Sequence, residues 1–337
     1  MRKKILFPAF FLIAAAIVYR LSSFSPELVS FSGPTMGTTY TVKFYTTEQV
    51  SNPWDLKDDV DDVLIKVNKL MSTYDPTSEL SEFNKLPAGQ SADISKDMAY
   101  VVDRALLISE MTSGEYDVTV GPLVNLWGFG PGKREDKVPS QASIDEAKER
   151  VGYEYLTLND QRLTKEKDIY VDLSSIAKGY GVDEVARVLR DKGVESYLVE
   201  VGGEISSQGV KPDGSPWKIA IESPAGGHSM AERILSLDDV AVATSGDYRN
   251  YFEKNGVRYS HTINPVTGKP ITHRLVSVTV IDKTATMADG LATAITVLGP
   301  EKGLAFAQDN GISAYLLVKT DFGFEELYSD AFQSYLK

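Results

Sequence analysis

Stretches rich in β-branched and aromatic residues alternate irregularly with amphipathic helical stripes, and this mixture is what most constrains the fold. The spacing lacks the regular strand-helix-strand repeat of a doubly wound parallel sheet. No repeat, low-complexity tract or long Pro/Gly/Ser linker follows the N-terminal segment, so residues 27–337 are expected to form one domain. We therefore predict an α+β fold with a largely antiparallel sheet and packed helices. The predicted strands are Thr39 to Tyr45, Ser196 to Val201, Trp217 to Glu222, Val240 to Thr244, Val276 to Ile281 and Ala314 to Val318.

Helices are predicted where apolar residues recur with a helical period. Trp54 to Met71 carries such a stripe, and Ser95 to Ser113 repeats it, with Ser95 as the N-cap and Gly114 as the stop. The run from Ser143 to Glu146 matches a capping box and predicts a short charged helix that ends near Gly152. A further helix is predicted from about Ile176 to Lys192, closed by Gly193.

The N-terminus has the pattern of an export signal. Met1-Arg2-Lys3-Lys4 precedes an apolar run from Ile5 to Tyr19, and residues 1–25 are expected to be a signal peptide or an N-terminal membrane anchor. The apolar run is short for a bilayer span, and no clear cleavage site follows it. We expect a periplasmic protein, attached to the inner membrane where the segment is not cleaved. The chain has no cysteine, which excludes disulfides, thiolate metal sites, a catalytic cysteine and lipoprotein attachment.

Charge argues against nucleic acid as a partner, because the formal net charge is -12. A protein of this charge that handles phosphate must concentrate its positive charge locally. The candidates are Lys178, Arg249, Arg258, Lys269 and a bound metal.

Two neighbouring polar runs indicate a functional site. Thr244-Ser245-Gly246-Asp247-Tyr248-Arg249 is followed by the run from Ser260 to Pro270, which together concentrate hydroxyls, a histidine and an arginine beyond what a turn needs. Farther on, the run from Ala288 to Thr293 has the pattern of a helix opening, with Asp289 and Thr293 one turn apart on one face. A carboxylate and a hydroxyl so placed favour Mg²⁺ or Ca²⁺ over zinc.

A predicted strand end that feeds a helix, from Val171 to Tyr180, is a candidate phosphate site because a helix N-terminus offers free N–H groups. Asp172 and Lys178 would then contact a ligand; alternatively, Asp172 or Ser174 caps the helix and Lys178 is solvated. Gly202-Gly203 permits either a tight turn or close approach of a ligand to the backbone.

Aromatic residues and glycines gather in the run from Tyr116 to Pro131, which predicts either a wall for a planar ring or core packing. Tyr74, at the end of a predicted helix, leaves the same alternatives open. His261 lies between a strand-like run and an Asn-Pro turn, and its imidazole is a candidate proton acceptor, although an isolated histidine is more often structural.

Taken in order, seven motifs resemble the ApbE-type FAD:protein FMN transferases, and the match spans essentially everything after the N-terminal segment. The motifs are Met36 to Thr39, Tyr116 to Pro131, Asp172 to Tyr180, Gly202-Gly203-Glu204, Thr244 to Arg249, Ser260-His261 and Ala288 to Thr293.

The resemblance implies a T-fold-like α+β catalytic domain that uses Mg²⁺ to split the pyrophosphate of FAD. FMN would move to a threonine or serine hydroxyl of a target flavoprotein, and AMP would leave. Respiratory or electron-transport membrane complexes would supply the acceptor subunits. The implied FAD site is Met36, Tyr74, Glu115, Tyr116, Asp117, Asp172, Lys178 and the Ile263 backbone. The implied metal site is Ser175, Asp289, Thr293 and the carbonyl of Ala292. The implied catalytic residues are Asp289 and His261, with His261 as the base.

Two alternatives remain for the activity. If water replaces the acceptor hydroxyl, the same site is an FAD pyrophosphatase that gives FMN and AMP. A non-catalytic, exported flavin-binding protein is the other, although simple binding needs neither a hard cation nor a base. A periplasmic solute receptor is disfavoured, because its two similar α/β lobes do not fit the strand spacing.

Overall fold

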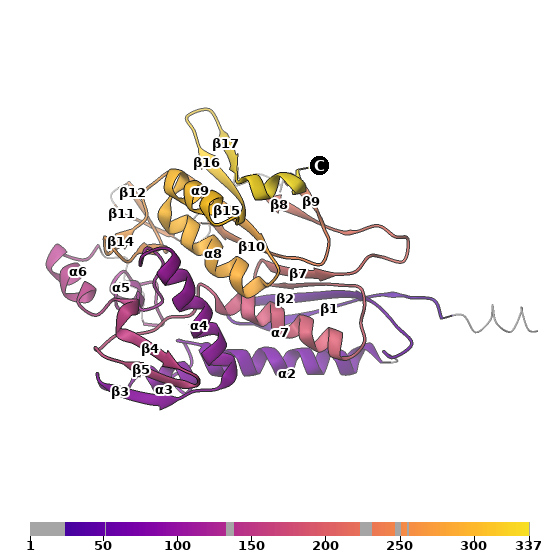
Figure 1. The fold of residues 1–337 in the computed structure, drawn as a ribbon, viewed down its shortest axis with the longest axis horizontal. Helices are drawn as coiled ribbons and strands as arrows, with labels where there is room; N and C mark the ends of the chain where they lie inside the picture. The colour runs from indigo at the N-terminus through magenta and orange to yellow at the C-terminus, as the bar shows by residue number, and fades with distance from the viewer. Residues whose placement is uncertain are drawn as a thin grey trace, which may run out of the picture.

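The computed structural model describes residues 24–50, 52–132, 138–222, 231–246, 251–254 and 256–336. An eight-stranded sheet forms its centre, in the order β1-β2-β6-β7-β10-β15-β16-β17, and every neighbouring pair is antiparallel (Figure 1). The prediction of an α+β fold with a largely antiparallel sheet is confirmed. The strands are β1 (Leu28–Thr35), β2 (Thr38–Tyr45), β6 (Tyr197–Val201), β7 (Glu204–Gln208), β10 (Ala241–Gly246), β15 (Leu275–Asp282), β16 (Ser313–Lys319) and β17 (Phe324–Tyr328).

Helices cover one face of this sheet. The α7 helix (Ala177–Asp191) packs on β6 and β7, and α8 (Ala285–Leu298) packs on β10 and β15. Outside them lie α2 (Pro53–Met71) against α7, and α4 (Lys96–Met111) and α9 (Pro300–Asp309) against α8 (Figure 1). Alternate residues of β2, Tyr40, Val42 and Phe44, are fully buried under α2 and α7, as the two-residue period of a half-buried strand requires.

The other face of the sheet carries a smaller apolar cluster. The hairpin of β8 (Trp217–Glu222) and β9 (Ala231–Leu237) contributes Trp217, and the C-terminal 3-10 helix η2 (Asp330–Tyr335) contributes Phe332. Phe332 stacks on Tyr315 of β16 with ring centroids 5.4 Å apart. The sheet is therefore buried on both faces over its C-terminal half.

Short elements fill the remaining end of the molecule beside α4 (Figure 1). Some of them surround a separate small cluster of apolar residues around Trp127, and the others pack on the main core. These elements are α3 (Glu79–Asn84), β3 (Gln90–Asp93), α5 (Gly121–Leu126), α6 (Gln141–Lys148), η1 (Tyr153–Tyr155), β4 (Leu156–Asn159), β5 (Arg162–Lys165), β11 (Tyr251–Lys254), β12 (Val257–Ser260), β13 (Ile263–Asn264) and β14 (Lys269–Pro270).

The helix termini test the predicted caps. Ser95 caps α4 by accepting a hydrogen bond from the Met98 backbone N–H, as predicted. The capping box at Ser143 is wrong, because Ser140 is the N-cap of α6 and its hydroxyl accepts from the Ser143 N–H. Ser140, three residues upstream, takes the capping role instead, so the helix begins one turn earlier, at Gln141.

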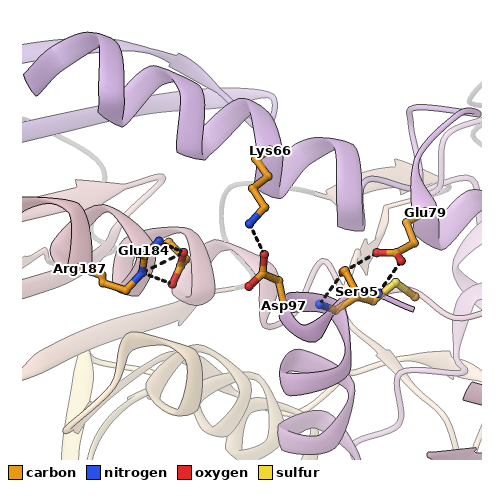
Figure 2. A network of polar contacts seen from close by, with 7 residues as sticks. Lys66, Glu79, Ser95, Asp97, Glu184 and Arg187 are labelled. Carbon is orange, nitrogen blue, oxygen red and sulfur yellow. Dashed lines mark hydrogen bonds and ion pairs between the residues drawn. The ribbon is translucent and has the colours of Figure 1, made fainter. Parts of the chain in front are cut away.

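Polar contacts connect α2, α3 and α4 (Figure 2). The Lys66 ammonium of α2 lies 2.5 Å from the Asp97 carboxylate of α4. Glu79 of α3 accepts hydrogen bonds from the backbone N–H and the hydroxyl of Ser95, both at 2.6 Å. Through these two hydrogen bonds the Glu79 carboxylate holds α3 against the start of α4. The loop before α3, which carries Tyr74, is fixed by the same contact.

The N-terminal export pattern lies almost wholly outside the described residues, which begin at Phe24. Among the helices that the structure describes, none is both long and apolar enough to span a bilayer.

Candidate active site

A cavity of about 810 Å³ opens where the start of α7 and one face of α8 meet β6, β7, β8 and β10. The loops after α4 and after β12 complete its wall. Most of the predicted site residues line it, although they come from separate parts of the chain: Tyr74, Glu115, Tyr116, Asp117, Asp172, Ser175, Lys178, His261, Ile263, Asp289 and Thr293.

Met36 and Ala292 are the predicted site residues that do not line the cavity. Met36 lies in the β1–β2 turn with a φ of 48°, and its sulfur faces Gly181 of α7. The carbonyl of Ala292 accepts a hydrogen bond from the Thr296 hydroxyl at 2.8 Å inside α8. The structure therefore gives Ala292 a bond along its own helix, and gives Met36 a packing contact.

Asp289 is placed by contacts between α7 and α8. Its Oδ2 accepts a hydrogen bond from the Gly179 backbone N–H at 2.9 Å, in the first turn of α7. Asp183 of α7 in turn accepts from the backbone N–H groups of Ala285 and Thr286, which start α8. α8 begins at Ala285 rather than at Ala288, so Asp289 and Thr293 lie within it, one turn apart and both facing the cavity. Sequence reasoning missed Asp183, which reaches across 102 residues to Ala285.

An ion-pair cluster occupies the floor of the cavity. The Lys178 ammonium lies 2.5 Å from Glu204 Oε1 and 3.6 Å from Asp289 Oδ1. Lys178 is therefore paired with two carboxylates, whereas the simpler interpretation of the sequence had it solvated. The sequence assigns no role to Glu204, although its position directly after two glycines is the signal that could have indicated one.

Burial and charge act in opposite directions on this cluster. Burial raises the pKa of Glu204 and of Asp289 above the ordinary carboxyl range, and the nearby Lys178 offsets part of the rise. Burial lowers the pKa of Lys178, but Asp289 and Glu204 raise it more, so the ammonium stays charged. With both carboxylates ionised, the cluster has a net negative charge, which a bound cation could compensate.

The Gly202-Gly203 pair forms the two-residue turn between β6 and β7. Both residues have positive φ, 61° and 106°, which a type I′ hairpin turn requires and glycine adopts at low cost. Both glycines also line the cavity, so the same two residues form a tight turn and leave their backbone accessible to a ligand. The turn places Glu204 at the first position of β7, opposite Lys178.

Hydroxyl groups gather beside Asp289. The Tyr116 hydroxyl lies 2.9 Å from Ser175 Oγ, and Ser175 and Thr293 both line the cavity. Asp172 does not cap α7, because its carboxylate accepts from the Ser174 N–H in the turn before the helix. The N-cap position of α7 is Ile176, which has no side-chain cap.

In the aromatic run from Tyr116 to Pro131, some side chains line the cavity and others pack in the core. Phe129 lines the cavity and meets His261 edge-on, with ring centroids 6.4 Å apart. Trp127 is buried in the apolar cluster, where its indole N–H donates to the Gly268 carbonyl at 2.9 Å. Tyr74 is 67% exposed at the cavity wall, and its hydroxyl donates to the Phe129 carbonyl at 3.3 Å. Core packing is therefore wrong for Tyr74.

Glu115 positions the loop that follows His261. Its Oε2 accepts from the Asn264 side-chain amide at 2.7 Å, and its Oε1 lies 3.5 Å from the Lys302 ammonium of α9. Ile263, which starts β13, is thereby held at the cavity wall.

Asp117 anchors the loop after α4, where it accepts from the Thr119 N–H and hydroxyl and from the Tyr153 N–H. Burial raises the pKa of Asp117 to about 6, against the pull of these hydrogen bonds. The folded state therefore binds a proton between the unfolded pKa of 3.8 and about 6, and the resulting stabilisation is lost as pH rises through 6.

We expect Asp117→Asn to flatten this part of the pH profile, by on the order of 2 kcal/mol in the free energy of unfolding between pH 4 and 7. Urea denaturation of both proteins across that range measures it. A difference between the two proteins that is constant with pH would show that Asp117 has an ordinary pKa.

Other candidate cations take different places. Arg258 stacks on Tyr251, with the guanidinium carbon 4.0 Å from the ring centroid, and neither Arg258 nor Lys269 lines the cavity. Residues Asp247 to Arg249, part of the polar run noted in the sequence, lie outside the described residues; Thr244, Ser245 and Gly246 line the cavity. Among described residues Lys178 is the only lysine or arginine on the cavity wall.

The donor set is one of oxygens. No group of three or more His, Asp and Glu side chains suited to a metal occurs in the described part of the chain. Asp289, Thr293 and Ser175 offer one carboxylate and two hydroxyls on the cavity wall. Such a set holds Mg²⁺ through few protein ligands and leaves the remaining positions to phosphate and water.

Comparison with known proteins gives consistent results. The ApbE family model matches residues 36–316. The FAD:protein FMN transferase of Vibrio cholerae is 48% identical over 311 residues, covering 92% of this chain and 93% of the relative. The one of Haemophilus influenzae is 43% identical over 332 residues, 96% of each. The solved flavin transferase ApbE of Vibrio cholerae superposes with a TM-score of 0.87 at 47% identity, covering 93% of this chain and 100% of that one. The apo flavinyl transferase ApbE of Pseudomonas stutzeri also gives 0.87, at 45% identity, with 93% and 98% covered.

Proposed function

The chain belongs to the ApbE family, and on that premise we propose that it transfers FMN from FAD to a protein acceptor. The acceptor group in this proposal is a threonine or serine hydroxyl, and AMP is the leaving group. One observation carries the proposal: Asp289, Thr293, Ser175 and His261 line a single cavity of about 810 Å³. That volume is within the range of pockets that enclose large organic ligands.

The proposal includes Mg²⁺, and the residues present fit this ion. Asp289 is 4% exposed, and Glu204 Oε2 is buried without a hydrogen-bond partner among the described residues, so the cavity floor has uncompensated acceptor capacity. Asp289, Thr293 and Ser175 would hold the ion. When bound, it neutralises charge that develops on the phosphate oxygens.

The chemistry assigns a separate task to each residue. The acceptor hydroxyl oxygen bonds to the FMN-side phosphorus, the bond from that phosphorus to the bridging oxygen breaks, and AMP leaves with the electron pair. His261 takes the proton of the acceptor hydroxyl, which is otherwise a weak nucleophile. Phe129 packs edge-on against the imidazole, and both side chains line the cavity.

We expect His261→Ala to slow transfer by about 10² to 10⁴-fold, the usual contribution of a general base, while FAD still binds. Transfer rates come from mass spectrometry of the acceptor, and FAD affinity from quenching of flavin fluorescence. His273→Gln is the control, because His273 Nε2 contacts the Thr296 carbonyl oxygen at 2.8 Å and does not line the cavity. An unchanged rate in His261→Ala would remove its role as base.

The test of the proposed function is mass spectrometry of a candidate acceptor domain incubated with this protein, FAD and Mg²⁺, with and without EDTA. A mass gain equal to FMN less water, lost with EDTA, supports a metal-dependent transferase. Release of FMN and AMP without a gain, on several acceptors, would favour the pyrophosphatase. If neither flavinylated acceptor nor free FMN and AMP is formed, the result would favour a flavin-binding protein.

We propose that the acceptors are flavoprotein subunits of respiratory or electron-transport membrane complexes, and that the reaction takes place in the periplasm. The basic start and the apolar run from Ile5 to Tyr19 support export, with residues 1–25 acting as a signal peptide or as an anchor in the inner membrane. Fractionation of cells that express the full chain, with N-terminal sequencing of the product, distinguishes the two.

A further inference from the structure

We propose that Lys178 and Glu204 are positioning residues that make metal binding depend on the nucleotide. In this proposal, which rests on the proposed function, Lys178 neutralises Glu204 and so leaves Asp289 as the single effective carboxylate of the metal site. A divalent cation then binds weakly until the diphosphate of FAD supplies further negative charge.

The first support is the geometry of the cluster. Lys178 Nζ lies 2.5 Å from Glu204 Oε1 and 3.6 Å from Asp289 Oδ1, so one ammonium faces both carboxylates. The Glu204 and Asp289 side chains are 3% and 6% exposed, which prevents water from screening them, whereas Lys178 is 31% exposed toward the cavity. The lysine is therefore the member of the cluster that an incoming cation meets first.

The second support is the state of each carboxylate oxygen. Asp289 Oδ2 is held by the Gly179 N–H, which leaves Oδ1 directed to Lys178. Glu204 Oε2 is buried and has no hydrogen-bond partner among the residues described. Glu204 thus keeps an acceptor oxygen that no described residue hydrogen-bonds, and without the lysine it would offer a second anionic ligand.

The charge count decides the outcome. Glu204, Asp289 and Lys178 sum to a charge of −1 when all are ionised; without the lysine the two carboxylates sum to −2 when a bound cation keeps both of them ionised. The affinity of oxygen-ligand sites for divalent cations follows the number of ligand charges. A site of −1 needs the phosphates of the substrate, whereas a site of −2 binds a cation alone.

The backbone around Lys178 keeps this arrangement fixed. A Cβ built on Gly202 would lie 3.2 Å from Lys178 Cδ, so the glycine turn packs directly on the lysine stem. The same turn places Glu204 at the start of β7. Lys178 is thereby directed to the two carboxylates by α7 on one side and by the turn on the other.

The experiment is a Mn²⁺ titration of the full chain without FAD or acceptor, followed by electron paramagnetic resonance of free Mn²⁺. We expect Lys178→Met to bind Mn²⁺ at least about tenfold more tightly than the wild type, because it removes a unit charge about 4 Å from the ligands. Lys178→Arg keeps the charge and should match the wild type. Glu204→Gln should bind more weakly, because Lys178 then competes for Asp289 alone.

The double variant Lys178→Met with Glu204→Gln has the charge of the wild type and should return to its affinity. A Lys178→Met affinity that is unchanged or weaker overturns the proposal, and so does a double variant that binds as tightly as Lys178→Met. Thermal melts identify any variant that does not fold; if Lys178→Met fails, an unchanged affinity in Glu204→Gln overturns the proposal by itself. Because the titration contains no flavin, its result can be interpreted even if the protein proves not to be a transferase.

Discussion

Asp289→Asn is expected to abolish FMN transfer while the protein remains folded. The substitution keeps an oxygen that can accept the hydrogen bond from the Gly179 N–H, so the contact between α7 and α8 survives. It removes the negative charge that would hold the cation beside Thr293. Substituting a residue that merely hydrogen-bonds to a metal ligand already lowers metal affinity or activity by about 10- to 100-fold. For the ligand itself we therefore expect the transfer rate to fall by more than about 10²-fold.

The measurement is the mass of an acceptor domain after incubation with FAD and Mg²⁺, together with a thermal melt of the enzyme. Asp309→Ala is the matched control, since Asp309 is an exposed carboxylate at the end of α9 and does not line the cavity. Transfer retained by Asp289→Asn in Mg²⁺ buffer would end the assignment of Asp289 to the metal. Loss of the folded state would instead assign Asp289 a structural role.

The fold could be predicted where local pattern and tertiary environment agree. The strand predicted at Val276 to Ile281 is β15, a buried interior strand between β10 and β16, where β-branched residues pack on both faces. β7 was not predicted, because Glu204–Gln208 is short and polar. Its strand conformation comes from pairing with β6 and β10 on either side, which no local pattern encodes.

The site could be predicted as a set of residues but not as a set of contacts. Asp289, Thr293 and His261 were identified by residue type and by resemblance, and the structure brings them to one cavity. The ion pair of Lys178 with Glu204 joins a helix to a strand 26 positions away, and neither residue type indicates its partner. The sequence pattern predicted that Asp289 and Thr293 share one face of a helix. The hydrogen bond of Asp289 to the Gly179 N–H could not be predicted, because it joins residues 110 positions apart and depends on how α7 packs on α8.

Gly179→Ala is expected to destabilise the protein strongly and to remove transfer together with stability. A Cβ at this position would lie 2.2 Å from the Ala285 carbonyl oxygen and 2.9 Å from Asp289 Cβ. The first of these is a backbone atom of α8, so the clash can be relieved only by moving α8 away from α7. Overpacking of this kind costs about 3 kcal/mol. The movement would also displace Asp289, whose carboxylate is bonded to the backbone of this same residue.

Gly181→Ala provides the matched control in the same helix. Its Cβ would lie 3.5 Å from Leu64 Cδ2 and from the Met36 sulfur, an ordinary van der Waals contact with flexible side chains. Alanine is a better helix former than glycine by about 1 kcal/mol, so this variant should be as stable as the wild type or more so. Urea denaturation measures both variants. Equal stabilities would show that α7 and α8 can separate freely at Gly179, and that the close approach of the two helices does not set the position of Asp289.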